Sequence, residues 1–442
     1  MYQKAEKLSQ IQNAFNPNPL ESKEELKEFY LKTSEARTGD KYSDFVETTL
    51  QELSNSTEVY QHKLFIGHPG CGKTTELYQL LQKTKESGFV SCFGRCDVEL
   101  DSADIEYTDV LFLILDLLVQ MSDEYGIEFD SGLVQSIHDY WKQDIDLINN
   151  KVSEKLQILE GDINGTVGLK GILSVMARLK GVIKNSSESR KQIRQHIEPS
   201  SSELVNKIQE VIEIISEESE KRGNKRTPFI ILDGLDKIPL GQAKKIFREN
   251  GARFSSLKVH LIVTFPISLT YSAEYGDILT WFPNPSKLPM IKLRKWEKDH
   301  YAQGYEEGLD SMKQIVEKRA DFALFDEGVL EELIRKTGGY IRDLFRCIST
   351  ASLRASMRQA SSISMDDAAM ALNGLESDLN GRYNDAAIPV MRKIYQGEKY
   401  VTISEEMTKL LQIGAVLEYN GERWCDLHPL VEKWLIEHGK ME

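Results

Sequence analysis

Short apolar runs recur along this chain between stretches with helical spacing, and this pattern predicts an α/β protein with a parallel sheet. After the apolar run at residues 64–66, Leu77, Leu80 and Leu81 follow at helical spacing. Residues 110–121 predict an apolar helix packed against the sheet. The runs with the length and apolar content of buried strands are residues 64–66, 88–93, 228–232, 259–263 and 290–293.

Segments outside the expected sheet are mostly helical in pattern. Ser22 followed by Glu25 is a capping-box start near the N-terminus. Beyond the last strand, alternating apolar and charged residues predict a helical lid over residues 297–318, 326–336, 342–357 and 366–372. A small winged helix is expected at the end, with helices near 386–396 and 404–411, strands at 415–419 and 423–427, and a turn at Asn420 and Gly421.

Residues 128–226 are long for one connection between strands and predict an insertion. Within it, residues 166–184 place apolar side chains on one helical face and contain basic residues but no acid. Such a segment lies on a membrane surface, docks a partner, or packs within its own chain. Three glycines weaken its helical propensity, and packing within the chain is the commoner arrangement.

Composition narrows the class of protein. The 442 residues carry a net charge of −14 and 40% hydrophobic residues, which fits several domains with real cores and argues against a generally basic surface. Five scattered cysteines lack metal-ligand spacing and indicate reduced thiols. Without an apolar leader or a long apolar run, we expect a cytoplasmic protein with no membrane span.

One stretch carries a specific chemical signature. Residues 67–74 read GHPGCGKT, a G-x-x-x-x-G-K-[ST] phosphate loop with a strand before it and a helix after it. Its glycines let backbone N–H groups surround a β-phosphate, Lys73 would reach the β- and γ-phosphates, and the Thr74 hydroxyl would hold Mg²⁺. The expected nucleotide-binding residues are Gly67, His68, Pro69, Gly70, Cys71, Gly72, Lys73, Thr74 and Thr75.

A second signature follows the strand at residues 228–232, which ends in Asp233. A carboxylate at the carboxyl end of a buried strand can hold the water shell of Mg²⁺, so Thr74 and Asp233 are the expected metal-site residues. Thr264, at the end of the neighbouring strand, either senses a γ-phosphate or simply ends the strand. Arg248 and Arg253 either act as arginine fingers across a subunit interface or lie on the surface.

The C-terminal module suggests DNA binding, but its charge opposes this. Acids outnumber bases over residues 376–442, and the second helix begins with Glu405 and Glu406. Phosphate contacts supply most non-specific affinity for DNA, so a nucleic-acid partner is possible but not favoured.

Three segments together resemble the STAND class of ATPases, relatives of the AAA+ and origin-recognition ATPases. GHPGCGKT, FIILDGLD at residues 229–236 and LIVTFP at 261–266 are similar to the phosphate-loop, magnesium-site and sensor strands of that class. The likeness covers roughly residues 30–440. The expected domains are a helical segment at 1–55, a P-loop NTPase domain at 56–295 with its insertion at about 128–226, a lid at 296–375 and a winged helix at 376–442.

The resemblance implies further site residues. Gly234 stands where motor-type AAA+ ATPases carry the glutamate that polarises water, and Asp236 is the nearest replacement, which implies slow hydrolysis. Arg342, in a turn similar to the second sensor of these ATPases, would reach the γ-phosphate from the lid. Residues 37–40 are either a contact for the adenine or a solvated loop.

A closing contact is implied by the segment LHPLV at residues 427–431, which resembles the M-H-D-L-V segment of the STAND winged helix. The histidine of that segment contacts the β-phosphate of ADP and latches the closed state. His428 matches it, but Pro429 replaces the aspartate, and His-Pro is also a common helix start.

We therefore expect an ATPase that binds ATP or ADP with Mg²⁺ and acts as a slow molecular switch. Catalysis would fall to Lys73, Asp233, Asp236, Thr264 and Arg342, and the output would be homo-oligomer assembly or binding of a partner effector protein. Members of the class often serve in bacterial defence. The alternatives are a DNA-associated AAA+ ATPase of loader or transposition-regulator type, and a scaffold that binds nucleotide without hydrolysis.

Overall fold

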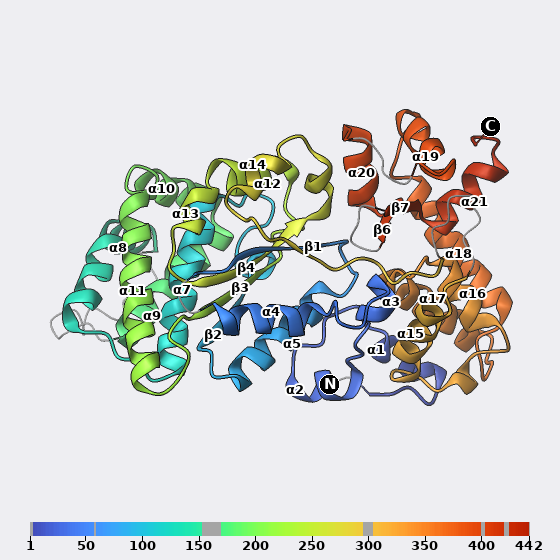
Figure 1. Ribbon diagram of the computed structural model, residues 1–442, viewed down its shortest axis with the longest axis horizontal. Helices are drawn as coiled ribbons and strands as arrows, with labels where there is room; N and C mark the ends of the chain where they lie inside the picture. The colour runs from blue at the N-terminus through green and yellow to red at the C-terminus, as the bar shows by residue number, and fades with distance from the viewer. Residues whose placement is uncertain are drawn as a thin grey trace.

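A parallel five-stranded sheet lies at the centre of the molecule, with strand order β2-β3-β4-β1-β5 (Figure 1). The computed structural model describes residues 3–56, 59–152, 169–294, 304–398, 403–419 and 424–441. The strands are β1 His62–Gly67, β2 Ser91–Arg95, β3 Phe229–Asp233, β4 His260–Pro266 and β5 Ser286–Lys287. All four pairings in this sheet are parallel, so the α/β class predicted from the sequence is confirmed.

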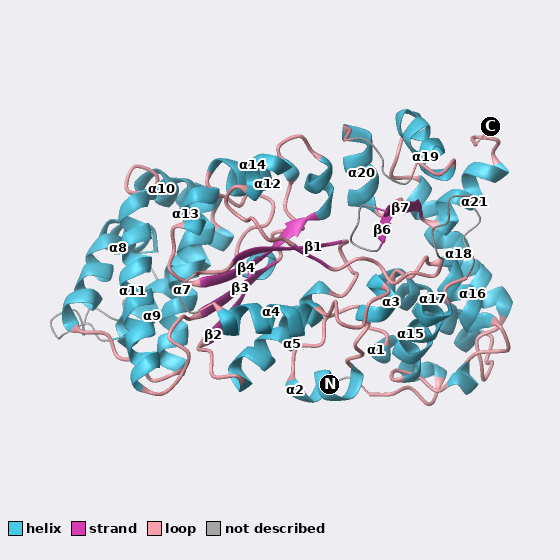
Figure 2. Cartoon of the chain, in the orientation of Figure 1, coloured by secondary structure: helices cyan, strands magenta, loops and turns pink. Residues whose placement is uncertain are grey.

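Helices cover both faces of the sheet (Figure 2). Within the nucleotide domain they are α4 Phe45–Asn55, α5 Lys73–Glu86, α6 Cys96–Glu99, α7 Tyr107–Glu124, α12 Leu240–Lys244, η2 Lys245–Glu249, α13 Gly251–Ser255, η3 Ile267–Tyr271 and α14 Tyr275–Leu279. Because successive strand residues point to opposite sides, Leu64 and Ile230 pack in the core that contains α7. Phe65 and Ile231 pack in the other core, with α4 and α5.

The insertion is a helical bundle that packs on α7 at one end of the molecule (Figure 1). Its helices are α8 Ser131–Val152, α9 Leu169–Asn185, α10 Ser187–Ile197 and α11 Ser201–Lys221. The apolar face of α9, including Met176 and Leu179, is buried in the same core as α7. Lys180 pairs with Glu99 and Asp116 at 3.0 and 2.7 Å. Packing within the chain therefore accounts for this basic amphipathic segment, of which residues 166–168 lie outside the described part.

The lid and the winged helix lie at the opposite end (Figure 1). Lid helices are α15 Glu306–Glu317, α16 Val329–Lys336, α17 Ile341–Met357 and α18 Met365–Asn380. The wing comprises α19 Ile388–Tyr395, α20 Glu405–Ile413, the antiparallel strands β6 Val416–Tyr419 and β7 Trp424–Leu427, and α21 Pro429–Glu437. The predicted turn at Asn420 and Gly421 lies outside the described residues, as do residues 297–303 of the first predicted lid helix.

The N-terminal segment packs on the lid. Its short helices are η1 Leu8–Gln10, α1 Ile11–Ala14, α2 Lys23–Phe29 and α3 Ser34–Thr38. The predicted capping box is present, because Ser22 accepts the N–H of Glu25 and the Glu25 side chain accepts the N–H of Ser22. Phe15 meets Phe345 of α17 edge to face, with ring centroids 5.2 Å apart.

The last strand of the sheet differs from the prediction. The strand beside β1 is Ser286–Lys287 rather than residues 290–293. Pro289 has no N–H to donate to a strand ladder. Beyond it, the Met290 N–H goes to the carbonyl of Glu418, so this segment pairs with the wing strand β6 instead.

Across the described ranges, every helix is too short or too polar to cross a membrane.

Candidate nucleotide-binding site

The phosphate loop connects β1 to α5 at the carboxyl end of the sheet. Gly70 and Gly72 have φ angles of +91° and +108°, and a Cβ on Gly70 would lie 2.5 Å from Nε of Arg342. Only glycine combines this backbone conformation with such a close approach. Because the loop leads directly into the first turn of a helix, its N–H groups form a cradle that fits a phosphate.

Thr74 and Asp233 are in direct contact. Thr74 Oγ1 donates to Asp233 Oδ2 at 2.6 Å, and Asp233 Oδ1 accepts the Gly234 N–H at 2.8 Å. Burial and the nearby Asp236 raise the pKa of Asp233, a penalty that a bound cation would offset. Mg²⁺ in nucleotide sites usually takes one or two protein groups besides phosphates and water, so this pair fits the ion. The metal role of Thr74 and Asp233 stays a prediction.

Lys73 is held by a carboxylate in this structure. Its Nζ lies 2.8 Å from Asp236 Oδ2, with both side chains buried, and donates to the carbonyls of Gly67 and His68 at 2.8 and 3.0 Å. Burial acts to lower the pKa of Lys73, but the charge and hydrogen bond of Asp236, together with the charges of Cys71 and Asp233, outweigh it and raise the pKa. The ammonium therefore stays charged, and a bound phosphate could replace Asp236 as its partner.

Thr264 lies behind the cavity rather than in its lining. Its buried hydroxyl accepts the N–H of Leu235 at 3.1 Å and so ties β4 to the loop of residues 233–236. Its role as a γ-phosphate sensor stays a prediction.

Two lid residues at the start of α17 touch the phosphate loop. The Arg342 side chain lies against Gly70 and lines the cavity. The Tyr340 hydroxyl donates to the carbonyl of Pro69. The structure therefore brings the predicted sensor arginine to the loop, although its contact with nucleotide remains a prediction.

The wing also touches the phosphate loop, through His68. This buried histidine accepts the Glu418 N–H at Nε2, 2.9 Å away. Burial and the charge of Lys73 lower the pKa of His68 to about 3, so the ring is neutral. Glu418 in turn accepts Lys287 Nζ at 2.8 Å and the Tyr271 hydroxyl at 2.7 Å, so one wing residue contacts three parts of the nucleotide domain.

His428 lies at the joint between wing and lid, outside the cavity lining. It caps α21 by accepting the Leu430 N–H at Nδ1, 3.2 Å away, and its Nε2 lies 3.6 Å from Asp343 of α17. Burial lowers the pKa of His428 to about 3 and raises that of Asp343 to about 6. The structure does not bring His428 to the phosphate loop, and its contact with ADP stays a prediction.

A cavity of 240 Å³ opens beside the phosphate loop. Of the predicted site residues, it is lined by Gly70, Gly72, Lys73, Thr74, Thr75, Asp236 and Arg342. Thr75 also accepts the N–H of Leu20, at 3.3 Å, which draws the N-terminal segment over the helix start. Gly67, His68, Pro69 and Cys71 lie in the loop without lining the cavity.

Part of the cavity lining comes from residues that belong to no sequence motif. Apolar side chains from the N-terminal segment and lid line it, among them Leu31, Ile315, Ile341 and Phe345. An apolar wall of this kind suits a flat base.

Two polar groups also line the cavity. Arg37 donates to the carbonyl of Cys71 in the phosphate loop at 2.8 Å, and the adenine contact of residues 37–40 stays a prediction. Glu76, one turn into α5, accepts the Tyr30 hydroxyl at 2.9 Å. Burial raises the pKa of Glu76 to about 7, against the opposing charge of Arg37.

Arg95 and Lys237 also line the cavity. The sequence pattern did not predict either of them as a site residue. Arg95 ends β2 and lies in register with Asp233 of β3. The sequence shows a cation at a strand end, but it does not show that β2 and β3 are neighbours in the sheet.

Fold and loop geometry together define a P-loop NTPase fold. No protein-family model matches the sequence, and the comparison with curated proteins gives no match. Among solved structures, the chain aligns with the ORC2 protein of Aeropyrum pernix in its ADPNP–ADP complexes at 12% identity, covering 97% of this chain and 98% of that one, with a TM-score of 0.44. A Walker-type ATPase of Pyrococcus abyssi aligns at 14% identity over 96% and 99%, with a TM-score of 0.43. Cdc6p of Pyrobaculum aerophilum aligns at 10% identity over 97% and 98%, with a TM-score of 0.41.

Proposed function

We propose that this chain is an ATP-binding, slowly hydrolysing molecular switch of the STAND and AAA+ kind, in which the nucleotide state controls how the wing docks. The observation that carries this proposal is the position of the phosphate loop. One side of the loop lines the cavity, while His68 and Pro69 on its other side bond to the wing strand β6 and to the lid turn. Any movement of the loop on binding phosphate therefore reaches both modules directly.

ATP binding begins with an exchange of partners at Lys73. Its ammonium leaves Asp236 for the β- and γ-phosphates, and the Asp236 carboxylate is left free beside the γ-phosphate. Arg342, already against Gly70, closes the lid over the same group. Mg²⁺ bound at Thr74 and Asp233 would neutralise charge on the phosphates. The apolar wall of the cavity holds the adenine.

Hydrolysis is slow in this proposal because the residue after Asp233 carries no carboxylate. A water attacks the γ-phosphorus, its proton passes to Asp236, and the bond to the β-phosphate oxygen breaks. Asp236 serves this step only after Lys73 has released it, so the base is available only when triphosphate is bound.

A switch works only when two states bind the two nucleotides with different affinity. A change from mostly docked to mostly undocked wing needs roughly 5.5 kcal/mol of differential binding. Contacts of Lys73 and Arg342 with the γ-phosphate would supply this difference, and they must also offset the loss of the His68 and Pro69 contacts on undocking. The undocked wing exposes surface for self-association or for a partner.

Size-exclusion chromatography with light scattering tests the proposal on the whole chain. Wild type, Lys73→Ala and the control Lys83→Ala, an exposed lysine of the same helix, are compared in ADP and in a non-hydrolysable ATP analogue with Mg²⁺. We expect assembly, or a larger hydrodynamic radius, only with the ATP analogue, in wild type and the control but not in Lys73→Ala.

The same samples are run with duplex DNA and assayed for phosphate release. Assembly that requires DNA would favour the DNA-associated alternative, and nucleotide binding without phosphate release would favour the scaffold. An identical mass and radius for wild type in both nucleotides would contradict the switch.

A further inference from the structure

The edge of the sheet beside Asp233 carries charged side chains that the proposed mechanism leaves unused. β2 and β3 are neighbours, and Arg95 at the end of β2 pairs in register with Asp233 at the end of β3. Because parallel strands end at the same edge, the residues that follow β2 meet the loop that follows β3. Arg95, Asp97 and Lys237 come together there.

The close packing of the residues after β2 against the loop after β3 requires glycine at position 234. Its φ is +92°, and a Cβ on it would lie 2.6 Å from Asp97 Oδ1 and 2.7 Å from the Asp97 backbone N. No side chain can stand at position 234, because the carboxylate of Asp97 already fills that space. The absence of a side chain at position 234 is therefore a packing requirement, because Asp97 of α6, just after β2, fills that space.

Asp97 acts through two cations rather than on the cavity itself. It accepts Arg95 Nε at 3.0 Å and Lys237 Nζ at 2.6 Å. Both cations line the cavity, whereas Asp97 does not. Burial acts to raise the pKa of Asp97, but the hydrogen bonds from Arg95 and Lys237 outweigh it and hold the pKa below its ordinary value. Asp97 is a positioning residue.

The position of Arg95 says which part of a ligand it meets. Its Nε lies 3.7 Å from Asp233 Oδ2, and Asp233 is bonded to Thr74 at the start of α5. Arg95 thus stands at the magnesium end of the phosphate site, where the last phosphate of a triphosphate lies in a phosphate loop. Lys237 lines the same cavity and donates to the same carboxylate oxygen of Asp97 as Arg95 Nη2 does.

Arg248 and Arg253, the candidate arginine fingers across a subunit interface, lie away from this cavity, and that role stays a prediction. Arg248 pairs with Asp277 at 2.8 Å, and Arg253 donates to Asn250 at 2.7 Å and lies over the ring of Tyr107. Neither lines the cavity.

We propose that Arg95 and Lys237, held by Asp97, form a γ-phosphate clamp built within the chain, which distinguishes a nucleoside triphosphate from a diphosphate. The inference rests on the proposed function, since it assumes that the cavity takes a nucleotide. Arg95 holds Asp97 with Nε and Nη2, which leaves Nη1, now 3.4 Å from Glu21 Oε1, to turn to a phosphate oxygen. Lys237 adds a point charge. A diphosphate ends short of both.

Equilibrium binding of fluorescent ADP and of a fluorescent non-hydrolysable ATP analogue, each with Mg²⁺, tests the clamp. Arg95→Ala is expected to weaken binding of the ATP analogue by about tenfold or more and to change ADP affinity by less than about twofold. Asp97→Asn should lower the ATP-to-ADP affinity ratio in the same direction by a smaller factor, and Arg95→Lys should restore part of it.

Arg248→Ala is the matched control, because it removes an arginine in an equally short aspartate pair outside the cavity. Melting temperatures confirm that each variant is folded. Equal losses for both nucleotides, or no loss, in a folded Arg95→Ala variant would overturn the clamp. Failure of the wild type to bind either nucleotide would instead overturn the proposed function.

Discussion

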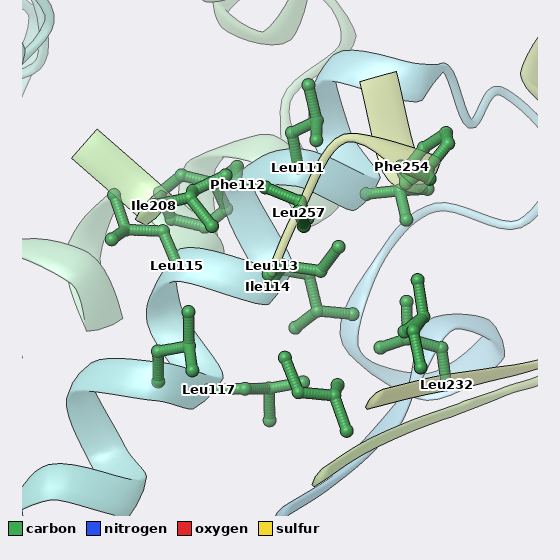
Figure 3. Close-up of a cluster of buried hydrophobic side chains, with 14 of the residues drawn as sticks. Leu111, Phe112, Leu113, Ile114, Leu115, Leu117, Ile208, Leu232, Phe254 and Leu257 are labelled. Atoms are coloured by element: carbon green, nitrogen blue, oxygen red, sulfur yellow. The ribbon is translucent and has the colours of Figure 1, made fainter. Parts of the chain in front are cut away.

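The insertion and the wing are joined to the nucleotide domain by different mixtures of contacts. The insertion shares one apolar core with α7, and Figure 3 shows Phe112 and Leu115 of that helix beside Ile208 of α11. The wing also has apolar contacts, since Leu417 lies in the same core as the sheet residue Phe65. It adds a buried polar contact through Glu418, whose side chain accepts hydrogen bonds from Lys287 and Tyr271.

The two attachments differ in what it takes to break them. Apolar burial is non-directional and scales with area, so the insertion moves with the sheet as one body. A buried carboxylate with several donors is stable only while every donor stays in place. The phosphate loop adds a further polar contact, because His68 accepts the Glu418 backbone N–H. Displacement of this loop therefore weakens the polar part of the wing attachment, which is the property that a switch requires.

The largest effect should come from a cavity in the insertion core. Phe112→Ala removes a ring that meets Trp141 edge to face, with centroids 5.4 Å apart, and should cost about 3–5 kcal/mol of unfolding free energy. Urea denaturation followed by circular dichroism measures it, with Phe112→Leu as the milder control. Unfolding of the insertion alone, with the nucleotide domain intact, would contradict the inference that the insertion and the sheet form one body.

Removal of the wing's buried carboxylate should have a smaller and more local effect. Glu418→Ala takes the partner from Lys287 and one acceptor from Tyr271, and should cost wing docking about 2–3 kcal/mol. Hydrogen exchange should rise in β6 and β7 and stay unchanged in α7 and α11. Glu418→Gln, which keeps an acceptor, should lose less. Equal acceleration in the insertion helices would show that the wing is part of the same rigid body.

Acid should release the wing by a still smaller amount. Burial and Lys73 lower the pKa of His68 to about 3 while the wing is docked, whereas an exposed histidine titrates near 6.5. The docked state needs the neutral ring, so its stability is full above pH 6.5 and falls as the pH drops toward 3. Between pH 7.5 and 5.5 the loss is about 1.4 kcal/mol.

Hydrogen exchange of the wing strands at the two pH values measures this loss. His68→Gln should flatten the dependence, because the amide oxygen accepts a hydrogen bond but does not titrate. His438→Gln, at an exposed position of the wing, is the control and should leave it unchanged. A pH dependence identical in His68→Gln and wild type would assign the effect to other groups.

The same contrast explains which features the sequence could predict. The phosphate loop, the contact of Thr74 with the β3 carboxylate and the helices depend on local spacing or on a strand end, and these emerge from the residue pattern. Arg95 beside Asp233 depends on strand order, and the Met290 N–H bonds to a residue of the wing. Leu31 and Phe345, which are far apart along the chain, line the same cavity. Contacts between distant segments leave no periodicity in the sequence, so these residues were missed.

The smallest expected effect comes from removing one tyrosine hydroxyl in each attachment. Tyr271 donates to Glu418 at 2.7 Å and lies 3.1 Å from Cys425 Sγ, so Tyr271→Phe should cost about 1 kcal/mol of wing docking. Tyr140 in the insertion makes only a 3.5 Å contact with Ser200, a distance at which little hydrogen-bond energy remains. Tyr140→Phe should therefore be close to neutral in urea denaturation, while Tyr271→Phe accelerates hydrogen exchange in β6. If the two substitutions cost the same, hydroxyl contacts do not distinguish the attachments, and the wing is held by its apolar contacts as the insertion is.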